Sequence, residues 1–573
     1  MKKGVSMKYV GCVMIGAVAI LCSCRDELRP DLSPAQEGKT NIIVNLTVER
    51  SGSKSPASRS PLDPNEDEYT LGFTDAENQI NSLTLIMMRI DASGNEVFEA
   101  SKTIQSPKDT DNDGDYDVEF QLETNDRGVK HFYLGANLRV EHLASFRTQD
   151  KVFDAGEEES GHNIVGALMN VKHSPDDELD GNIGEGSNIV MTAPILVENR
   201  QDITIPSGST EETIKIDNPV KLTRTVAKVL LTCVPKSDAE EYVKVIDAKD
   251  AKTNPEGDGE NTGWIKFADV NYMLNVLNRK TYLNYRIEND NLIDPNYAMG
   301  ELISLREEGG GYGITNLDEY QREFLYYDTQ AMVEMLNKDV QDREGKTPEA
   351  CTSRIAIKYD ETKIGKVNAD EDHYTEGLYC TENTVYKDMT FANEADFQSA
   401  IRYVTTRVMV GAKYTPKVIW NGGEEPITNE TEEDAQKILQ EVRDDGNPLE
   451  PVTYLAGTFW RDSEGNYYSL AGMKKKLKES SGTDFSRYDG GWGYYYTYID
   501  ENAKNGAISK DQTRWGIKRN HYYILKVDKI IAPGSPFPGN ETMRIHSELV
   551  DWVNKGGSEV EIKVPQQSET AQP

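Results

Sequence analysis

The sequence is poor in the residues and motifs that carry catalysis. Only seven of its 573 residues are histidine, and they are scattered without the spacing of metal ligands. It contains no His-Glu-x-x-His pair, no Gly-x-x-x-x-Gly-Lys phosphate-binding loop and no Gly-x-Ser-x-Gly turn. These absences exclude the zinc proteases, P-loop enzymes and serine hydrolases that carry such motifs. Nothing in the sequence predicts an enzyme.

Basic residues are scarce relative to acidic ones. The chain has 63 Lys and Arg against 97 Asp and Glu, which gives a formal net charge of −34. A chain of this charge is repelled by the phosphates of nucleic acids and by anionic membrane surfaces. We therefore expect no nucleic-acid partner.

Long apolar runs are also lacking, except near the N-terminus. The run 10–21 follows a segment with three lysines, has the length of an export signal and is too short to span a membrane. It ends in Leu21-Cys22-Ser23-Cys24, and a small residue directly before a cysteine is the pattern that lipoprotein signal peptidases read. We predict that 1–23 is a signal peptide and that Cys24 is lipidated and holds the precursor in the outer membrane. An ordinary secreted protein cut nearby is the alternative.

Cysteine is scarce after this signal. Only Cys233, Cys351 and Cys380 remain, an odd number for a protein of an oxidising compartment. One reading joins Cys351 and Cys380 in a disulfide. The other makes all three small buried apolar residues, and it is favoured for Cys233 because this residue lies inside the apolar run 229–234.

A segment with the pattern of a half-buried strand follows a polar linker. Four apolar residues occupy alternate positions and would share one face of this strand: Ile42, Val44, Leu46 and Val48. The residues that follow, 49–61, are rich in Ser, Gly and Pro. They predict an exposed loop that a protease can reach.

Two arginines in this loop are cleavage sites for a protease of trypsin-like specificity. Cleavage between Arg59 and Ser60 is our first choice because it leaves a short lead into the next strand. Cleavage between Arg50 and Ser51 is the alternative, although Arg50 lies almost against the preceding strand. Residues 24–59 would then be a propeptide made of a linker and a removable strand. The remaining reading is an ordinary flexible linker behind a lipid anchor.

The rest of the chain alternates short runs of branched and aromatic residues with Asp, Asn and Gly turns. Such spacing predicts an all-β protein built of antiparallel sandwiches. The expected strands are 80–90, 118–122, 131–134, 189–197, 213–216, 222–234, 404–414, 492–499, 520–527, 542–553 and 559–564. A few helices are expected as decorations on the sheets, at 317–336, 392–404 and 433–442, with one more ending at 474–478.

The last expected strand is one-sided in the same way as the first. Val560, Ile562 and Val564 face one side, and charged residues alternate with them on the other. One face of this strand is expected to be buried, so the strand needs another element to pack against.

An acidic loop between two expected strands resembles the first half of a calcium site. Its carboxylates at Asp109, Asp111, Asp113 and Asp117 are oxygen ligands of the kind Ca²⁺ takes. The twelfth position of an EF-hand loop requires Glu and is Phe120 here, so the helix-loop-helix reading fails. A calcium-binding hairpin loop and a solvated acidic hairpin tip are the two readings left, and no other cofactor is predicted.

The order of several segments along the chain is informative. They are NQINSLTL (78–85), LTRTVAKV (222–229), LYCTEN (378–383) with VTTRVMVG (404–411), and YYYTYI (494–499) with KRNHY (518–522). Together with the lipoprotein signal they resemble the fimbrillin family of the Bacteroidales, which builds type V pili, and within it the major subunits of short fimbriae.

This resemblance implies a fold and a route of assembly. The fold is two Greek-key, transthyretin-like β-sandwich domains, 60–220 and 221–573, with a donor-strand appendage at about 542–564. In assembly, a trypsin-like protease removes the first strand of an exported lipoprotein, and a C-terminal strand of another subunit fills the groove. Val560, Ile562 and Val564 would belong to the donor, and 545–553 either donates with them or belongs to the subunit's own sheet.

The function implied is that of a structural subunit of a surface fimbria that polymerises with copies of itself and supports adhesion. A tip or anchor subunit of the same fimbria is an alternative. A surface glycan-binding lipoprotein is another, which would keep 41–59 and use exposed aromatic residues such as Trp420, Trp460 or Trp492.

Overall fold

The computed structural model describes much of the chain in separate stretches. These are, with short gaps inside several of them, residues 39–49, 79–138, 168–170, 189–233, 242–246, 261–337, 352–354, 378–384, 394–440, 456–499, 516–538, 545–551 and 558–562. Residues 109–114 form one of the gaps.

Two sheets make up the N-terminal part. The first has the order β10-β1-β4, with β9 also paired to β1: β1 (Thr40–Glu49), β4 (Tyr116–Thr124), β9 (Glu211–Lys215) and β10 (Val220–Lys221). The second has the order β11-β7-β5-β2-β3, with β8 beside β5: β2 (Ser82–Ile90), β3 (Glu96–Gln105), β5 (Gly128–Ala136), β7 (Met191–Pro194), β8 (Ile203–Ile205) and β11 (Thr223–Arg224). One apolar core joins side chains of both sheets, so the two form a sandwich.

Two larger sheets form the C-terminal part. One has the order β24-β12-β34-β36-β37: β12 (Val226–Cys233), β24 (Leu378–Thr381), β34 (His521–Val527), β36 (Ile545–Asp551) and β37 (Ser558–Ile562). The other has the order β13-β15-β26-β32, with β23 beside β15: β13 (Tyr242–Val243), β15 (Gly263–Asn275), β23 (Thr352–Arg354), β26 (Arg407–Pro416) and β32 (Trp492–Tyr498). A second apolar core contains residues of both sheets.

Short ladders and helices surround these sheets. The ladders are β14 (Val245–Ile246) with β35 (Ile530–Ile531), β16 (Leu277–Asn278) with β22 (Phe324–Leu325), β17 (Lys280–Tyr282) with β6 (Leu168–Asn170), β18 (Arg286–Glu288) with β19 (Asn291–Ile293), β20 (Ile303–Leu305) with β21 (Tyr312–Ile314), β25 (Asn383–Thr384) with β33 (Gly516–Ile517), β27 (Val418–Ile419) with β28 (Ile427–Thr428), and β29 (Phe459–Asp462) between β30 (Tyr467–Tyr468) and β31 (Phe485–Tyr488). The α-helices described are α3 (Leu317–Glu323), α4 (Thr329–Leu336), α5 (Glu394–Ile401), α6 (Glu432–Leu439) and α7 (Leu470–Glu479).

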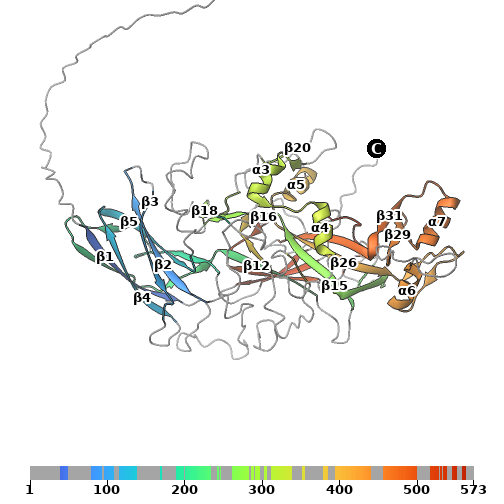
Figure 1. The fold of residues 1–573 in the computed structure, drawn as a ribbon, viewed down its shortest axis with the longest axis horizontal. Coiled ribbons are helices and arrows are strands. Elements are labelled where there is room, and N and C mark those ends of the chain that lie inside the picture. Colours follow the sequence, from blue (N-terminus) through green and yellow to red (C-terminus); the bar gives the residue numbers. More distant parts are fainter. Residues whose placement is uncertain are drawn as a thin grey trace, which may run out of the picture.

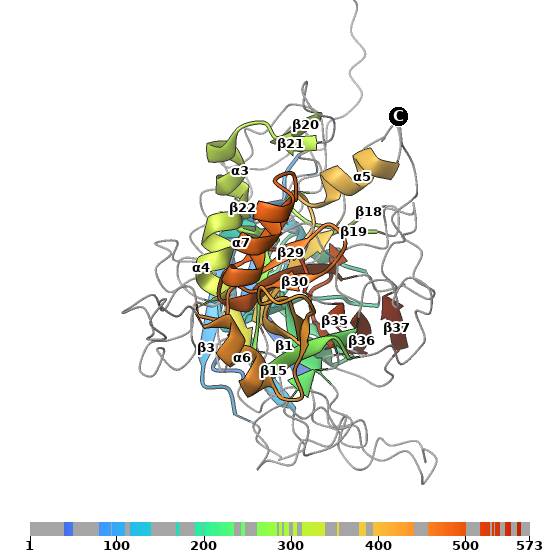
Figure 2. The same cartoon turned by 90° about the vertical axis from the view of Figure 1, so that its right-hand side faces the viewer.

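These parts follow one another along a long axis. Figure 1 shows β1 to β5 at one end, β12, β15 and β26 in the middle, and the lobe of β29, β31, α6 and α7 at the other end. Figure 2, which looks along this axis, shows β36 and β37 on the opposite side of the C-terminal part from α3 and α4. Among the described residues, no helix has the length and apolar character to cross a membrane.

The expected all-β fold with a few helices is confirmed, with two local corrections. A single helix over 317–336 was wrong, because Phe324 and Leu325 are extended, are buried and pair with β16, so the segment splits into α3 and α4. The longest strand, β15, was missed. It has a register irregularity between Ile265 and Val270, which interrupts the period-two pattern that reveals a strand.

Candidate assembly groove at the first strand

β1 lies inside its sheet and not at an edge. It pairs antiparallel with β4 from Thr40 to Val48, and on its other side it pairs parallel with β9 and then with β10. Both of its backbone edges are therefore occupied. Removing it would open a gap in the middle of the sheet and leave the facing edges of three strands, β4, β9 and β10, without their partner.

From Ile42 to Val48 the inward face of β1 is apolar and buried. Ile42, Val44 and Val48 are 0% exposed and Leu46 is 4% exposed. They share one core with residues of the neighbouring β4 and of β2 and β5 in the facing sheet: Phe120, Leu122, Leu83, Leu85, Phe132 and Leu134. At roughly 1.5 to 3 kcal/mol for each buried side chain, the four contribute on the order of 6 to 12 kcal/mol. β1 is thus a large part of what holds the N-terminal sandwich together.

Polar contacts fix the register of β1 at its beginning. The Thr40 hydroxyl donates to the Ser209 carbonyl at 2.7 Å, and Arg127 donates to both the Thr40 hydroxyl and the Ser209 carbonyl. The Asn41 amide donates to the Thr210 carbonyl at 3.0 Å. These contacts join β1 to the loop before β9 and define where a strand in this place must begin.

The outer face of β1 carries exposed partners. The Lys39 ammonium donates to Glu123 at 2.7 Å, and this hydrogen bond and the carboxylate charge raise the pKa of Lys39. The Thr47 hydroxyl donates to Asp117 at 2.6 Å. Asp117, the one predicted calcium ligand that is described, is therefore an exposed residue of β4 engaged with β1.

The strands expected at the C-terminus lie in the subunit's own sheet. β36 pairs antiparallel with β34, so 545–551 is a strand of the body. β37 pairs with β36 and with no other described strand, in a register that sets Val560 opposite Ser547 and Ile562 opposite Ile545. It is an edge strand, held on one side.

Several predicted site residues lie outside the described part of the chain. They are Cys24, Arg50, Ser51, Arg59, Ser60, Asp109, Asp111, Asp113 and Val564. Lipidation, cleavage and calcium binding therefore stay predictions. Among the described residues no group of three or more metal-ligating side chains is placed to hold a metal ion.

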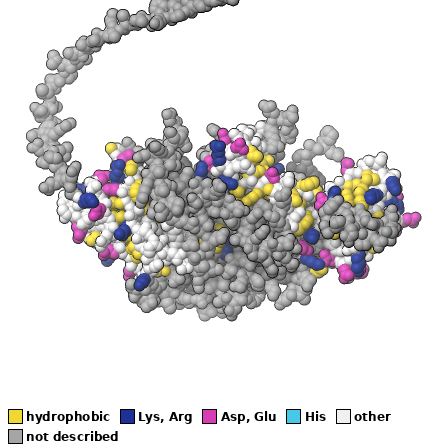
Figure 3. Space-filling model, viewed as in Figure 1, with side chains coloured by type: hydrophobic (Ala, Val, Ile, Leu, Met, Phe, Trp, Pro, Cys, Tyr) yellow, Lys and Arg dark blue, Asp and Glu magenta, His cyan; other side chains and the backbone are white. Residues whose placement is uncertain are grey.

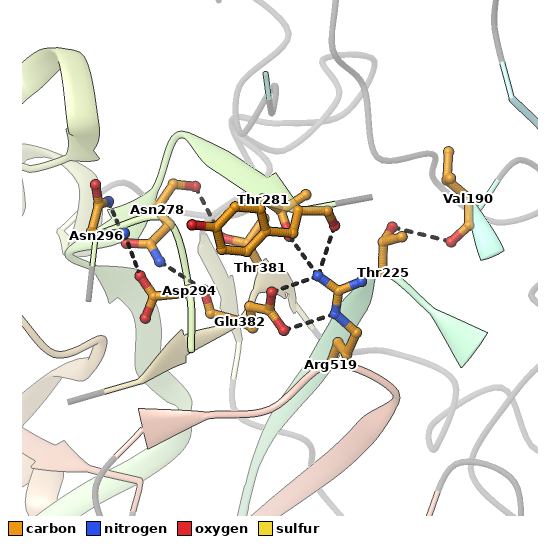
Figure 4. A network of polar contacts seen from close by, with 10 residues as sticks. Val190, Thr225, Asn278, Thr281, Asp294, Asn296, Thr381, Glu382 and Arg519 are labelled. Atoms are coloured by element: carbon orange, nitrogen blue, oxygen red, sulfur yellow. Dashed lines mark hydrogen bonds and ion pairs between the residues drawn. The ribbon is translucent and has the colours of Figure 1, made fainter. Parts of the chain in front are cut away.

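A buried polar network in the C-terminal part was not predicted from the sequence. Arg519, just before β34, donates through Nε to Oε2 of Glu382 at 2.7 Å and through a terminal nitrogen to its Oε1 (Figure 4). The same nitrogen donates to the Thr281 hydroxyl and to the Tyr282 carbonyl. Burial raises the pKa of the Glu382 carboxyl, and the charge and hydrogen bonds of Arg519 oppose this rise. A single sequence gives no sign that two residues so far apart form a pair.

The two parts meet next to this network. β11 belongs to the second N-terminal sheet and β12 to a C-terminal sheet, so the chain changes sheets at Thr225, whose hydroxyl donates to the Val190 carbonyl. The side-chain oxygen of Asn520, beside Arg519, accepts hydrogen bonds from the backbone amide and the guanidinium of Arg224. The backbone amide of Asn520 donates to the Val226 carbonyl. The domain limits at 220 and 221 stay a prediction, and these contacts are where the two parts are joined.

Residues 486–571 match the family model described as the C-terminal region of fimbrillin, major fimbrial subunit protein type IV. The C-terminal end of the chain is therefore similar to that of fimbrillin subunits. The matched range includes β32, β34, β36 and β37, which belong to the two large C-terminal sheets.

Solved structures with a distant likeness to this chain cover most of its length. A candidate cell adhesion protein from Parabacteroides distasonis is 13% identical with a TM-score of 0.38, over 90% of this chain and 100% of that one. A fimbrilin (FimA) from Porphyromonas gingivalis is 14% identical with a TM-score of 0.36, over 92% and 99%. The tip fimbrial protein Mfa3 from Porphyromonas gingivalis, with a C-terminal truncation, is 12% identical with a TM-score of 0.30, over 90% and 100%. No curated protein sequence matches the chain.

Three further residues considered in the sequence analysis, Cys380, Trp420 and Trp460, can be located in the structure. Cys380 is a free, buried thiol on β24 whose pKa is raised by burial, so it fits the reading of a small apolar core residue. Trp460 is buried, whereas Trp420 is half-buried and stacks on Tyr468. Trp460 is therefore not an exposed aromatic residue against which a sugar could stack.

Proposed function

We propose that this protein is a fimbrillin, a structural subunit of a cell-surface fimbrium whose polymerisation is triggered by proteolysis. The precursor is lipidated at Cys24 and held in the outer membrane. A trypsin-like protease cuts after Arg59, with Arg50 as the alternative, and β1 leaves with the propeptide. The C-terminal strand of another subunit then takes its place, and the product is a homopolymer on the cell surface that supports adhesion.

The observation that carries this proposal is the position of β1. It is a central strand with four buried apolar side chains, and it is the last described element before the segment with the two arginines. A strand with neighbours on both sides leaves a groove whose ends and side-chain sites are defined. An unpaired apolar groove of this kind is a template for strand addition.

The proposal also implies a direction for the incoming strand. A strand that restores both ladders must run antiparallel to β4 and parallel to β9, as β1 does. Its apolar residues must fall at alternate positions to fill the sites of Ile42, Val44, Leu46 and Val48. Val560, Ile562 and Val564 have this spacing.

Of the two described strands nearest the C-terminus, β37 is easier to release than β36. It is held only by β36 among the described strands, so releasing it breaks one ladder, whereas β36 is paired on both sides. Groove and donor lie at different places on the subunit, so the contact between subunits is heterologous and need not close into a ring. A filament is the product of repeating it.

Limited trypsin digestion of the mature-length protein tests the proposal. We expect a cut after Arg59 or Arg50, a stable body, and then filaments in electron microscopy with ladders on denaturing gels. Because trypsin also cleaves after Lys54 in the same loop, the variants carry Lys54→Gln as background. Adding Arg59→Gln or Arg50→Gln then identifies the site that matters, and the variant with all three substitutions should remain monomeric. A cut that yields only stable monomers would contradict polymerisation and favour a tip or anchor subunit.

A further inference from the structure

The helix α7 is a basic element in an acidic chain. Four of its ten residues are lysine, Lys474, Lys475, Lys476 and Lys478, whereas the whole chain has 97 acidic residues against 63 basic ones. Lys475 pairs with Glu479 at 3.7 Å. Lys474 and Lys478 are exposed, and within the described residues neither has a carboxylate partner. These two ammonium groups can therefore meet an anionic surface.

The packing of α7 turns these two lysines outward. Gly472 approaches Trp420 so closely that a Cβ at this position would lie 1.9 Å from the Trp420 carbonyl oxygen, so this side of the helix faces the body of the lobe. With 3.6 residues in each turn, Lys474 and Lys478 point about 200° and 240° away from Gly472. Leu477, which is 38% exposed, lies between them on the same outer face.

A surface of opposite charge lies on β4. Its exposed side presents Asp117, Glu119 and Glu123, and of these only Glu123 is paired with a cation, Lys39, among the described residues. Asp117 and Glu119 accept hydrogen bonds from a hydroxyl and a side-chain amide, which leave their charges unbalanced. Figure 1 shows β4 and α7 near opposite ends of the long axis, and Figure 3 shows Lys and Arg side chains at the tip of the α7 lobe.

The two surfaces match in spacing as well as in charge. Lys474 and Lys478 are four residues apart on a helix, which is a rise of about 6 Å. Asp117 and Glu119 are two residues apart on a strand, which is about 7 Å. Two ammonium groups one turn apart can therefore face two carboxylates at alternate strand positions. Because the two pairs lie near opposite ends of the molecule, they can meet only between separate copies.

We propose that the outer face of α7 binds the exposed side of β4 in a second copy of this chain, head to tail. Two copies of net charge −34 repel each other, but at physiological salt this repulsion is screened beyond about 8 Å, whereas charges in contact are screened less. The exposed Leu477 gives the contact an apolar centre. β4 stays in the subunit when β1 leaves, so the contact depends neither on cleavage nor on strand exchange.

Carbodiimide cross-linking of the uncleaved, mature-length protein tests this contact, because the reagent joins an ammonium group directly to a carboxylate that touches it. Isotopically labelled and unlabelled protein are mixed, so that a peptide pair carrying one label comes from two copies. We expect such pairs to join Lys474 or Lys478 to Asp117 or Glu119. Cross-links from these lysines mainly to other carboxylates would overturn the proposal. Filament formation after cleavage is measured separately, so failure of either proposal leaves the other standing.

Charge reversal decides whether the contact is electrostatic. Lys474→Glu with Lys478→Glu should lower the yield of cross-linked dimer at least tenfold. Adding Asp117→Lys and Glu119→Lys to the same chain should restore it, with the same four positions joined in the reverse sense. A combined variant that stays monomeric would overturn the proposal. All four positions are exposed, and circular dichroism checks that each variant is folded.

A matched control reverses two other exposed cations of the same lobe. Lys437→Glu with Arg487→Glu changes the net charge by the same amount and should cross-link like the wild type. Retention on heparin, a sulfated polysaccharide, is measured for the same set of variants. A wild type that gives no dimer but is retained on heparin through Lys474 and Lys478 would assign α7 to a polysaccharide and overturn the contact between copies.

Discussion

In the N-terminal part the middle of a sheet is filled by a strand that precedes the predicted cleavage sites, whereas in the C-terminal part both large sheets consist of strands that follow residue 225. β1 has β4 on one side and β9 and β10 on the other. β37 has β36 alone among the described strands. The first part therefore depends on a strand that one cut can detach, and the second part does not.

Both parts contain buried charge. In the N-terminal part the fully buried Lys130 pairs with Glu99 and the fully buried Glu96 pairs with His131, whereas the pair at the start of β1, Lys39 with Glu123, is exposed, with both side chains more than half accessible. In the C-terminal part the pair of Glu382 with Arg519 is almost fully buried and is completed by further hydrogen bonds. Satisfied polar contacts therefore help to hold both parts, while β1 itself is held by apolar burial.

The largest effect should come from a charge on the inward face of β1. Val44→Asp buries a carboxylate in an apolar core, and we expect it to lower the stability of the N-terminal part by about 4 kcal/mol or more. Hydrogen exchange in increasing urea measures the loss of stability separately in each part. Asn41→Asp, on the exposed face of the same strand, is the control. Equal loss of protection in both parts would show that the C-terminal part also depends on β1.

The second effect should be confined to the C-terminal part. Glu382→Gln removes the charge that balances Arg519, and breaking a buried pair in this way costs about 3 to 5 kcal/mol. Glu433→Gln, in the exposed pair with Lys437 on α6, is the control. Urea titration of both variants should separate them. A loss as small as that of the control would mean that Thr281 and Tyr282 alone satisfy Arg519.

A smaller effect should depend on pH. Burial opposes the charged form of His131, but hydrogen bonds and charges of Glu96 and Asp202 outweigh it, so the pKa of the imidazole is raised above 6.5. The folded state then binds the proton more tightly than the unfolded state. The stability from this group is fully present below pH 6.5 and is lost as pH rises through the raised pKa.

We expect the N-terminal part to lose about 0.5 to 1.5 kcal/mol over that rise, the contribution of a hydrogen bond. Urea midpoints measured from pH 6 to pH 8 test this, and His131→Gln should give a flat profile. Asp202→Asn should reduce the slope, because it removes one of the two carboxylates. A slope that persists in His131→Gln would assign the effect to another group.

The sequence revealed the strands with a clear local pattern. β1 alternates apolar and polar residues over a full strand, β32 and β34 are runs rich in aromatic and branched residues, and the places of all three were predicted within a few residues. The burial of the inward face of β1 follows from the same alternation. That β1 is central could not be read from its sequence, because its partners β9 and β10 are more than 160 residues away.

What the sequence could not reveal depends on distant contacts. The break between α3 and α4 arises because Phe324 and Leu325 pair with β16 and are buried there, which overrides local helical preference. Glu382 and Arg519 each look like ordinary surface residues in the sequence, as does Arg407. Only the fold shows that all three are buried.

The smallest effect should come from the exposed pair at the start of β1. The contact with Glu123 raises the pKa of Lys39, but both side chains are in water, where solvent and salt screen the attraction and the ordering of two long side chains offsets it. We therefore expect Lys39→Gln and Glu123→Gln to leave the urea midpoint of the N-terminal part unchanged within error at physiological salt. A loss comparable to that of His131→Gln, or a strong dependence on salt, would mean that the start of β1 is held by charge as well as by apolar burial. Release of the strand after cleavage would then be faster at high ionic strength, which a stopped trypsin digest at two salt concentrations can measure.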